Sequence, residues 1–323
     1  MRRLLGKKPV TRAALRLATI AVIVTAVLAS ATGCSLRLFR RPAPAGQEPT
    51  LTLFSHKDNT TKQIKLEEYI QGVVAAEIQP DWPMEALKAQ AIVARTFTLQ
   101  KRDEGTVRPI HGTDACDSKD HFQAYDPSRI NENVKRAVQE TRGMVILFGG
   151  KPIRAWFHSN SGGKTATAQE GLNFTQESAP YAVPVDDPMS LQNAPADQKS
   201  WTATFSAGDL SGAAAKLGKS VSGVKSASIG KKGPSGRALT IVINGQEFPA
   251  AELRTSLGPE RMKSTLLDSV SVSGGKVVMK GRGWGHGVGM SQWGAEAMAK
   301  AGKKAEDIIK FYFKGVDLTK MWQ

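Results

Sequence analysis

The sequence of 323 residues is poor in cysteine and in acidic residues. Cys34 and Cys116 are the only cysteines, so a framework of internal disulfides is excluded even in an oxidising compartment. Asp and Glu number 29 against 44 Lys and Arg, which gives a formal net charge of +15. No internal repeat is visible, and the length suits one large domain or two ordinary ones.

The N-terminal segment, residues 1–33, has the pattern of a targeting sequence. Six basic residues precede an apolar run at 17–33 that carries no charge. Because the basic residues are concentrated before the run, we expect the N-terminus in the cytoplasm and the rest of the chain outside. Residues 31–34 also resemble a lipoprotein processing site, where Cys34 would be lipidated. An uncleaved anchor and a lipoprotein both remain open, and both tether an extracytoplasmic domain to a membrane.

The charge of the exported part predicts an anionic partner. Six of the 15 net positive charges lie in the targeting segment, which leaves +9 on the remainder. Outside a membrane, the anionic candidates are cell-wall polymer and lipid headgroups. The sequence has neither a basic helix nor an aromatic-basic ribbon, and export argues against nucleic acid, so we expect no nucleic-acid partner. A merely soluble basic surface is the alternative.

The pattern along the chain predicts an α+β protein. Residues 34–50 are a Pro-rich linker, so we expect one domain over 51–323. The helical period over 66–102 is interrupted by the prolines at 80 and 83, while alternating strands and short helices predict a β-rich lobe at about 200–280. We therefore expect a helical core with an inserted β-rich lobe and a substrate groove between them. Further predicted elements are strands at 51–54, 61–65, 144–148, 153–157, 238–244, 269–273 and 276–280, and helices at 131–141, 250–257, 292–301 and 305–313.

Glu77 is a carboxylate on an apolar helical stripe. On a helix, Leu66, Ile70, Val73 and Glu77 follow one another at steps of four, three and four and share one face. A carboxylate facing a core is paired, protonated or functional, because desolvating an unpaired charge is costly. Such a site raises the pKa, as a general acid near neutral pH requires. Glu77 is thus a candidate catalytic acid, and a helix-end residue or an ion pair with Arg95 is the structural alternative.

The segment 281–298, GRGWGHGVGMSQWGAEAM, has glycine at every second position up to 289. In an extended strand this alternation gives one bare face and one face of side chains. The bare face allows close approach by a backbone or a flat ligand, and the other offers Arg282, Trp284 and His286. With Gln292 they form a candidate sugar-binding set. The spacing does not fit a dinucleotide-binding loop, and a glycine-lined packing strand is the alternative.

The segment 153–166, IRAWFHSNSGGKTA, ends like a phosphate-binding loop. His158 stands where that loop requires glycine, and export removes the chain from cytosolic ATP, so nucleotide binding is rejected. Without a G-x-S-x-G elbow, a serine nucleophile beside His158 is not expected. We expect a substrate-binding loop that uses His158, Ser161 and Lys164, and a plain turn is the alternative.

The segment 111–125, HGTDACDSKDHFQAY, is a candidate metal loop. His111, Cys116 and His121 are spaced so that a loop can bring them together on zinc. Three ligands with water make a catalytic type of site and four a structural one, and a fourth is not evident. An ordinary polar loop is the alternative.

Four segments in this order closely resemble the stage II sporulation protein D (SpoIID/LytB) family: EEYIQGVVAAEIQPDWPMEALKAQAIVARTFTL, HSNSGGKTA, PYAVPVDDP and GRGWGHGVGMSQWGAEAMAK. The resemblance implies a membrane-anchored lytic transglycosylase that cuts peptidoglycan glycan strands lacking stem peptides. It further implies action during engulfment, at the mother-cell membrane facing the forespore, with a partner amidase of the stage II sporulation protein P type. The family's catalytic glutamate, in its V-x-A-E segment, corresponds to Glu77.

The implied chemistry fits a lone carboxylate. Glycosidases generally need two carboxyl groups. A lytic transglycosylase uses the sugar's own C6 hydroxyl and leaves a 1,6-anhydro end, so one carboxyl group can act as acid and then as base. The alternative classes are a binding protein that enhances an amidase, as the LytB name implies, and an adhesin for anionic polymer. Some relatives bind zinc through a loop ending in His-Cys; here Phe122 follows His121, so at most three ligands and no required cofactor are expected.

Overall fold

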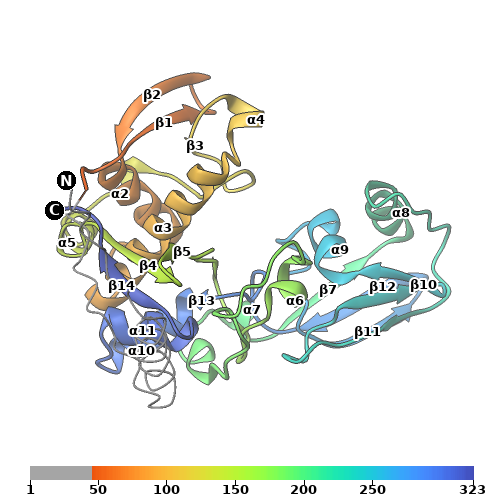
Figure 1. The fold of residues 1–323 in the computed structure, drawn as a ribbon. Coiled ribbons are helices and arrows are strands. Elements are labelled where there is room, and N and C mark those ends of the chain that lie inside the picture. The colour runs from red at the N-terminus through yellow and green to blue at the C-terminus, as the bar shows by residue number, and fades with distance from the viewer. Residues whose placement is uncertain (1–45) are drawn as a thin grey trace, which may run out of the picture. The chain divides into compact units, whose positions relative to one another are not determined.

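The structure is a computed structural model that describes residues 46–323, and its class is α+β (Figure 1). Residues 44–323 form one compact unit. The targeting segment, Cys34 and most of the linker lie outside the described residues. Within residues 46–323, every helix is too short or too polar to cross a membrane.

The first sheet joins the start of the domain to the metal loop. Strands β1 (Thr50–Ser55) and β2 (Thr60–Lys65) form an antiparallel hairpin, whose turn uses Asn59 at φ 52°. Strand β3 (Ala115–Cys116) pairs parallel with β1, in a register that sets Cys116 opposite Phe54. The hairpin turn and the loop around β3 therefore lie close together.

The helical region is built around α3 (Met84–Glu104). Helix α2 (Leu66–Glu77) precedes it across the predicted corner at 80–83, and α3 also contacts α5 (Glu132–Glu140), α10 (Gln292–Lys300) and α11 (Ala305–Tyr312). The stripe predicted on α2 is confirmed, because Leu66, Ile70 and Val73 are fully buried. Three shorter helices, α4 (Arg108–His111), α6 (Ala168–Leu172) and α7 (Ala196–Lys199), and two 3-10 turns, η1 (Pro127–Arg129) and η2 (Pro188–Leu191), lie in the connections.

Two small sheets tie the end of the chain to its middle. Strand β14 (Asp317–Lys320) pairs with β4 (Met144–Phe148), which pairs with β5 (Lys151–Pro152). Strand β13 (Met290–Ser291) runs parallel to β6 (Phe157–His158). The continuous strand predicted at 153–157 is wrong, because the Trp156 N–H turns back to the Arg154 carbonyl instead of joining a ladder.

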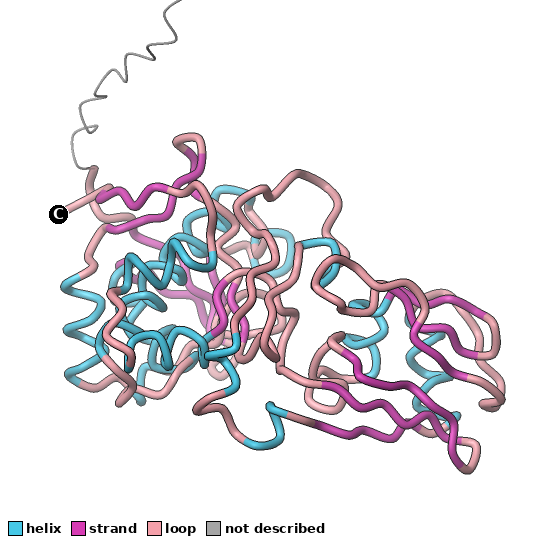
Figure 2. Tube along the Cα trace, turned by 90° about the horizontal axis from the view of Figure 1, so that it is seen from below, coloured by secondary structure: helices cyan, strands magenta, loops and turns pink. Residues whose placement is uncertain are grey.

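The β-rich lobe has a core of its own. Strands β7 (Trp201–Phe205), β11 (Leu267–Ser273) and β12 (Lys276–Gly281) form one sheet, and β8 (Ala227–Ile229), β9 (Thr240–Ile243) and β10 (Gln246–Pro249) form another. Helices α8 (Ala207–Lys216) and α9 (Ala250–Leu257) pack with them. Figure 2 shows the strands of these two sheets gathered in this part of the chain and most helices in the other. The core of the lobe comprises mainly Phe205, Leu210, Ile241, Phe248, Leu253 and Met279.

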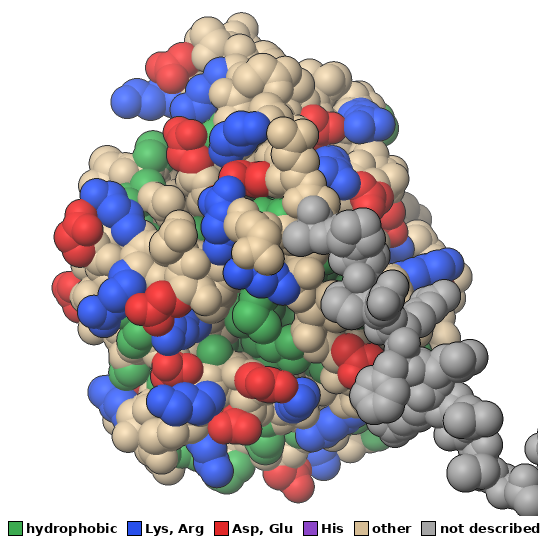
Figure 3. Space-filling view, turned by 60° about the vertical axis from the view of Figure 1, so that its left-hand side comes forward, with side chains coloured by type: hydrophobic (Ala, Val, Ile, Leu, Met, Phe, Trp, Pro, Cys, Tyr) green, Lys and Arg blue, Asp and Glu red, His purple; other side chains and the backbone are tan. Residues whose placement is uncertain are grey.

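Charged side chains of both signs mix on the surface. Figure 3 shows Lys and Arg interspersed with Asp and Glu over the face in view. The net positive charge does not form a continuous basic patch on that face, which is what a nucleic-acid site would require.

Candidate functional site

A cavity of about 790 Å³ lies between the helical region and the β-rich lobe. Its walls come from the end of α2, from α3, from the loop after β3, from β6, from α9 and the loop after it, and from the glycine-rich segment. The residues of the predicted site that line it are Glu77, His158, Trp284, His286 and Gln292. The structure thus brings together residues from the two ends of the chain.

Glu77 is the last residue of α2 and presents its carboxyl group to this cavity. The Ala124 N–H donates a hydrogen bond of 2.9 Å to Glu77 Oε1. Burial raises the pKa of Glu77, while the Ala124 N–H, the Gln292 amide and Lys119 lower it, and no described carboxylate contributes to the shift. The balance leaves a carboxyl group that holds its proton to higher pH than an exposed glutamate.

The other carboxylates that line the cavity are those of Asp120 and Glu260, and both residues are exposed. Glu260 forms an ion pair with Lys119, at 3.1 Å. Neither therefore shares the buried environment of Glu77, which is the group suited to donating a proton.

Arg95 lies away from the cavity, inside the helical region. Its side chain is fully buried, and Nη2 lies 2.6 Å from Oε2 of Glu67, while Nη1 donates to the Met144 carbonyl at 3.1 Å. Two expectations about Arg95 are therefore corrected: it does not pair with Glu77, and it does not face the substrate groove. Its partner lies at the opposite end of α2.

His158 and His286 form a neutral pair on the cavity wall, with ring centroids 5.5 Å apart. Burial lowers the pKa of His158 well below its usual value and that of His286 to about 3. His158 Nδ1 lies 3.1 Å from the Val288 carbonyl, so it carries the ring proton and donates it. His158 Nε2 is buried without a partner among residues 46–323, and it offers a lone pair to a ligand hydroxyl.

The loop that carries Ser161 and Lys164 is held by the protein itself. Ser161 Oγ donates to Asp187 at 2.8 Å, and burial raises the pKa of Asp187 to about 6. Arg237, fully buried in the lobe, donates to the carbonyls of Ser161 at 2.7 Å and Lys164 at 2.8 Å. Lys164 Nζ lies 3.5 Å from Asp186. Neither Ser161 nor Lys164 lines the cavity, so their predicted contact with substrate stays a prediction.

The glycine-rich segment is not the extended strand that its alternation predicted. Gly283, Gly285, Gly287 and Gly289 have φ values of 79°, 112°, 83° and 70°, which side-chain-bearing residues rarely adopt. The expected close approach is confirmed, since a Cβ on Gly285 would lie 2.7 Å from His158 Cβ. The segment carries Trp284 and His286 into the cavity. Arg282 pairs with Asp268 at 3.2 Å and does not line the cavity, so its predicted contact with substrate stays a prediction.

A second cluster lies beside the cavity and comprises His56, His111, Cys116 and His121, whose ligand atoms lie within 4.8 Å of one another. Three imidazoles and one thiol match the ligand number and type of a tetrahedral zinc site. His56 Nδ1 lies 2.5 Å from Asp117, which leaves Nε2 of that ring for a metal, as in many zinc sites. The expectation of at most three ligands is therefore wrong, because the pairing of β1 with β3 supplies His56.

The residues that sequence reasoning missed are His56, Lys119 and Arg254. The chain has only five histidines, and each lies in the cluster or lines the cavity, with His121 doing both. Their scarcity was a signal that could have found His56. Lys119 and Arg254 line the cavity from the loop after β3 and from α9. Nothing in their local sequence marks them.

Comparisons with known proteins identify the family of the chain. A family model described as stage II sporulation protein matches residues 55–148, which include Glu77 and the four cluster residues. Stage II sporulation protein D of Bacillus amyloliquefaciens is 33% identical over 299 residues, covering 85% of this chain and 82% of that protein. The chain belongs to the stage II sporulation protein D family. The resemblance seen in the sequence is thereby confirmed.

Other relatives show the range of the SpoIID family. Stage II sporulation protein D of Bacillus subtilis is 30% identical over 304 residues, covering 86% of this chain and 83% of that protein. An amidase enhancer of Bacillus subtilis is 32% identical over 296 residues, covering 77% of this chain and 40% of that protein. SpoIID relatives therefore carry names from sporulation and from the enhancement of an amidase.

Proposed function

We propose that this SpoIID-family protein is a lytic transglycosylase that cleaves peptidoglycan glycan strands lacking stem peptides and leaves 1,6-anhydro ends. The proposal rests on the Glu77 carboxyl group. This group faces a cavity of about 790 Å³, and burial raises its pKa. Because no described carboxylate perturbs it, a mechanism with one acid–base group fits better than one with a buried carboxylate pair.

In this mechanism the protonated Glu77 gives its proton to the glycosidic oxygen while the bond from C1 to that oxygen breaks. The C6 hydroxyl of the same sugar attacks C1 and releases its proton to the Glu77 carboxylate. No water is consumed, and Glu77 ends in its starting state. The Ala124 N–H and the Gln292 amide stabilise the carboxylate between the two transfers.

The remaining cavity residues suit a polysaccharide. The Trp284 ring lines the cavity, and Lys263 Nζ lies over this ring, 4.5 Å from its centroid. His158 Nε2 offers an acceptor to a sugar hydroxyl. The neutral histidine pair and the Trp284 ring therefore suit the hydroxyl groups and the apolar face of a sugar ring.

The test incubates the full-length protein in detergent with peptide-free glycan strands and analyses the products by mass spectrometry. We expect 1,6-anhydro products, each lighter by one water than a hydrolysis product, and a rate reduced about 100-fold or more in Glu77→Gln. Equal rates for both proteins would remove Glu77 from the mechanism. Hydrolysis products would point to a second carboxyl group, and Asp120→Asn and Glu260→Gln would identify it.

The second candidate is a glycan-binding protein that stimulates an amidase without cutting glycan, and its support is the amidase enhancer among the relatives. In that case Glu77→Gln retains both glycan binding and stimulation of the amidase, and neither protein yields anhydro products. A glycan pull-down combined with the cleavage assay separates the two candidates.

The proposed setting follows the family. An amidase of the stage II sporulation protein P type removes the stem peptides, and the present protein then cuts the bare strand during engulfment, tethered through its N-terminal segment to the mother-cell membrane. Imaging a fluorescent fusion with and without residues 1–33 tests the tether, since the shortened protein should leave the membrane.

A zinc ion is also proposed for the cluster of His56, His111, Cys116 and His121. Bound there, zinc would supply a cross-link between the β1–β2 hairpin and the loop after β3. That loop ends at Ala124, whose N–H holds the Glu77 carboxylate. The four residues therefore support the site of Glu77 without touching it.

A further inference from the structure

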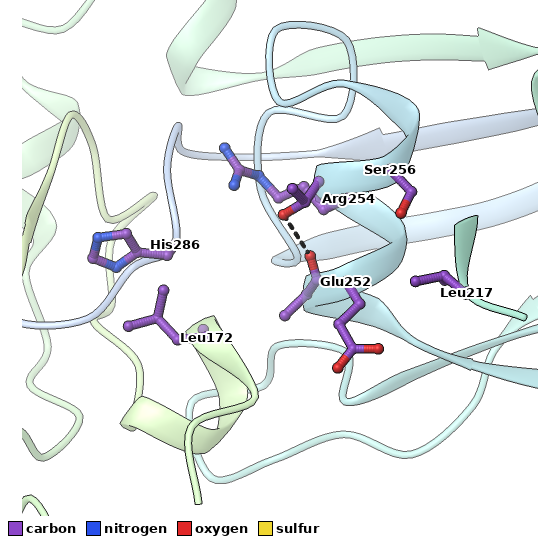
Figure 4. A pocket seen from close by; sticks show the side chains of 9 residues that line it. Leu172, Leu217, Glu252, Arg254, Ser256 and His286 are labelled. Carbon is purple, nitrogen blue, oxygen red and sulfur yellow. Dashed lines mark hydrogen bonds between the residues drawn. The ribbon is translucent and has the colours of Figure 1, made fainter. Parts of the chain in front are cut away.

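Arg254 is a partly buried arginine on α9 whose terminal nitrogens have no hydrogen-bond partner in the part of the chain that the structure describes. Its Nε donates to the Lys263 carbonyl at 3.0 Å. Its Nη groups donate no hydrogen bond within residues 46–323, and no carboxylate of those residues lies within 4.0 Å. Figure 4 shows the side chain extending from α9 toward the loop that carries His286.

Arg254 faces open space on two sides. It lines the cavity of about 790 Å³ that holds Glu77 and a neighbouring one of about 320 Å³, and His286 lines both. The His286 ring, with a pKa of about 3, is neutral and does not neutralise or repel the guanidinium. The free face of the fork therefore lies at the junction of the two cavities.

The other cations of the larger cavity are already paired. Lys101 lies 3.5 Å from Glu104, and Lys119 lies 3.1 Å from Glu260. Burial lowers the pKa of Arg254 only to about 10, so it remains charged at neutral pH. Among the described residues, Arg254 is the cation of this cavity that has no carboxylate within 4.0 Å. Glu260, which is already paired with Lys119, acts on it only from farther away.

An unpaired, partly desolvated guanidinium favours an anionic ligand. Removing a charge from water without a partner is costly, and a ligand that supplies the opposite charge recovers that cost. The planar fork binds a carboxylate through two parallel N–H···O bonds, stronger and more directional than neutral hydrogen bonds. The glycan of the proposed function carries one such group, the lactyl carboxylate of each muramic acid residue.

We infer that Arg254 binds the lactyl carboxylate of a muramic acid residue from which the stem peptide has been removed. The inference rests on the proposed function and deepens it. In a strand that still bears peptides, the lactyl carbonyl is an amide, uncharged and bulky. Hydrolysis of that amide consumes one water and yields the lactyl carboxylate and the free amine of the peptide. The amidase reaction must therefore come first, because it creates the group that Arg254 binds.

The test compares two substrates that differ in this charge alone. One is the peptide-free strand with its lactyl carboxylates, and the other is the same strand with those groups converted to neutral methylamides. We expect kcat/KM of the unmodified protein to be about 10- to 100-fold higher on the carboxylate strand. Arg254→Met should lose this preference, with little further loss on the methylamide strand, and Arg254→Lys should retain part of it.

The matched control is Arg136→Met, which removes one charge from the exposed face of α5, outside both cavities, and should keep the full preference. Thermal unfolding of each variant checks that it folds. The inference is overturned if Arg254→Met lowers kcat/KM equally on both strands. It is also overturned if the unmodified protein has the same kcat/KM on both strands.

Binding measurements on the Glu77→Gln variant distinguish failure of the role inferred for Arg254 from failure of the proposed function. Calorimetry with each strand should give tighter binding of the carboxylate form, and Arg254→Met should abolish the difference. If binding discriminates but no variant cleaves glycan, transglycosylation is wrong while the role of Arg254 stands. If cleavage occurs without discrimination, the reverse holds. Binding of neither strand refutes both.

Discussion

Helix α2 carries a glutamate at each end. The two differ in how many hydrogen bonds the protein donates to their carboxylates. Glu67, at the first end, accepts hydrogen bonds from Arg95, from the Gly143 N–H at 3.0 Å and from Trp322 Nε1 at 2.9 Å. Glu77, at the C-terminal end, accepts one from the Ala124 N–H, has the Gln292 amide as a further favourable neighbour and otherwise faces the cavity. A fully satisfied carboxylate holds the fold together, whereas an incompletely satisfied one is left for a ligand.

The arginines repeat the contrast. Arg95 is fully buried and its donors are taken by Glu67 and a backbone carbonyl. Arg254 gives one hydrogen bond to the protein and turns the rest of its fork to the cavity. An arginine side chain thus has a structural role in the helical region, whereas in the lobe it keeps donors that can bind a ligand. The tertiary surroundings decide which of its N–H donors are left without a protein partner.

The largest effect is expected where the pairing is complete. Arg95→Met leaves Glu67 as an uncompensated buried charge, so we expect the free energy of unfolding to fall by about 3–5 kcal/mol. Urea unfolding followed by circular dichroism measures it. The double variant Arg95→Met, Glu67→Gln should recover part of the loss, since it removes the stranded charge. If Arg95→Met lowers the free energy of unfolding by less than about 1 kcal/mol, the two ends of α2 do not differ as described.

The next effect concerns the metal cluster, which supports the loop beside Glu77. Zinc at about 100 times its dissociation constant should raise the free energy of unfolding by about 2.7 kcal/mol. Metal content of the purified protein and its unfolding with and without a chelator give the measurement. His56→Asn should lower zinc affinity, whereas His158→Asn, which replaces a histidine outside the cluster, should not. Unchanged affinity in His56→Asn would return the site to three ligands.

A smaller effect is expected where the pairing is incomplete. The pKa of Arg254, about 10 in the folded chain, is below its usual value because of burial, so the unfolded chain holds this proton more tightly. Its charge therefore opposes folding at neutral pH, and this cost persists until pH exceeds both pKa values. Arg254→Met keeps most of the apolar stem. Its free energy of unfolding should therefore be higher than that of the parent, or lower by no more than about 1 kcal/mol. A loss as large as that of Arg95→Met would make Arg254 a structural residue too.

The smallest effect is a displaced pH profile. Catalysis starts from protonated Glu77, so kcat/KM should fall as pH rises through its raised pKa. Gln292→Met removes an amide that favours the ionised form, so the pKa should rise further and the falling limb should move to higher pH. Gln139→Met, an exposed change on α5, serves as the control and should leave the limb in place. A limb that moves to lower pH in Gln292→Met contradicts the assigned contact.

Much of the fold followed from local patterns, and parts of the site did not. The break at 80–83 and the stripe of Leu66, Ile70 and Val73 were predictable because proline and helical period act over a few residues. The prediction of an extended strand through the alternating glycines was wrong. Glycine also permits positive φ, and packing against residues 156–162 favours that conformation here. The contacts that Asp187 and Arg237 make with Ser161 and the Lys164 carbonyl could not be predicted, because these partners come from distant segments.

By itself the sequence determined the family, the α+β class and the position of Glu77 at the end of an apolar stripe, since motif order and periodicity are written along the chain. Only the tertiary structure decided which charges are satisfied. It paired Arg95 with Glu67 rather than Glu77, and it placed His56 beside His111, Cys116 and His121. It also left the Nη groups of Arg254 without a hydrogen-bond partner among the described residues. Each depends on contacts between residues far apart in sequence, which local patterns do not specify.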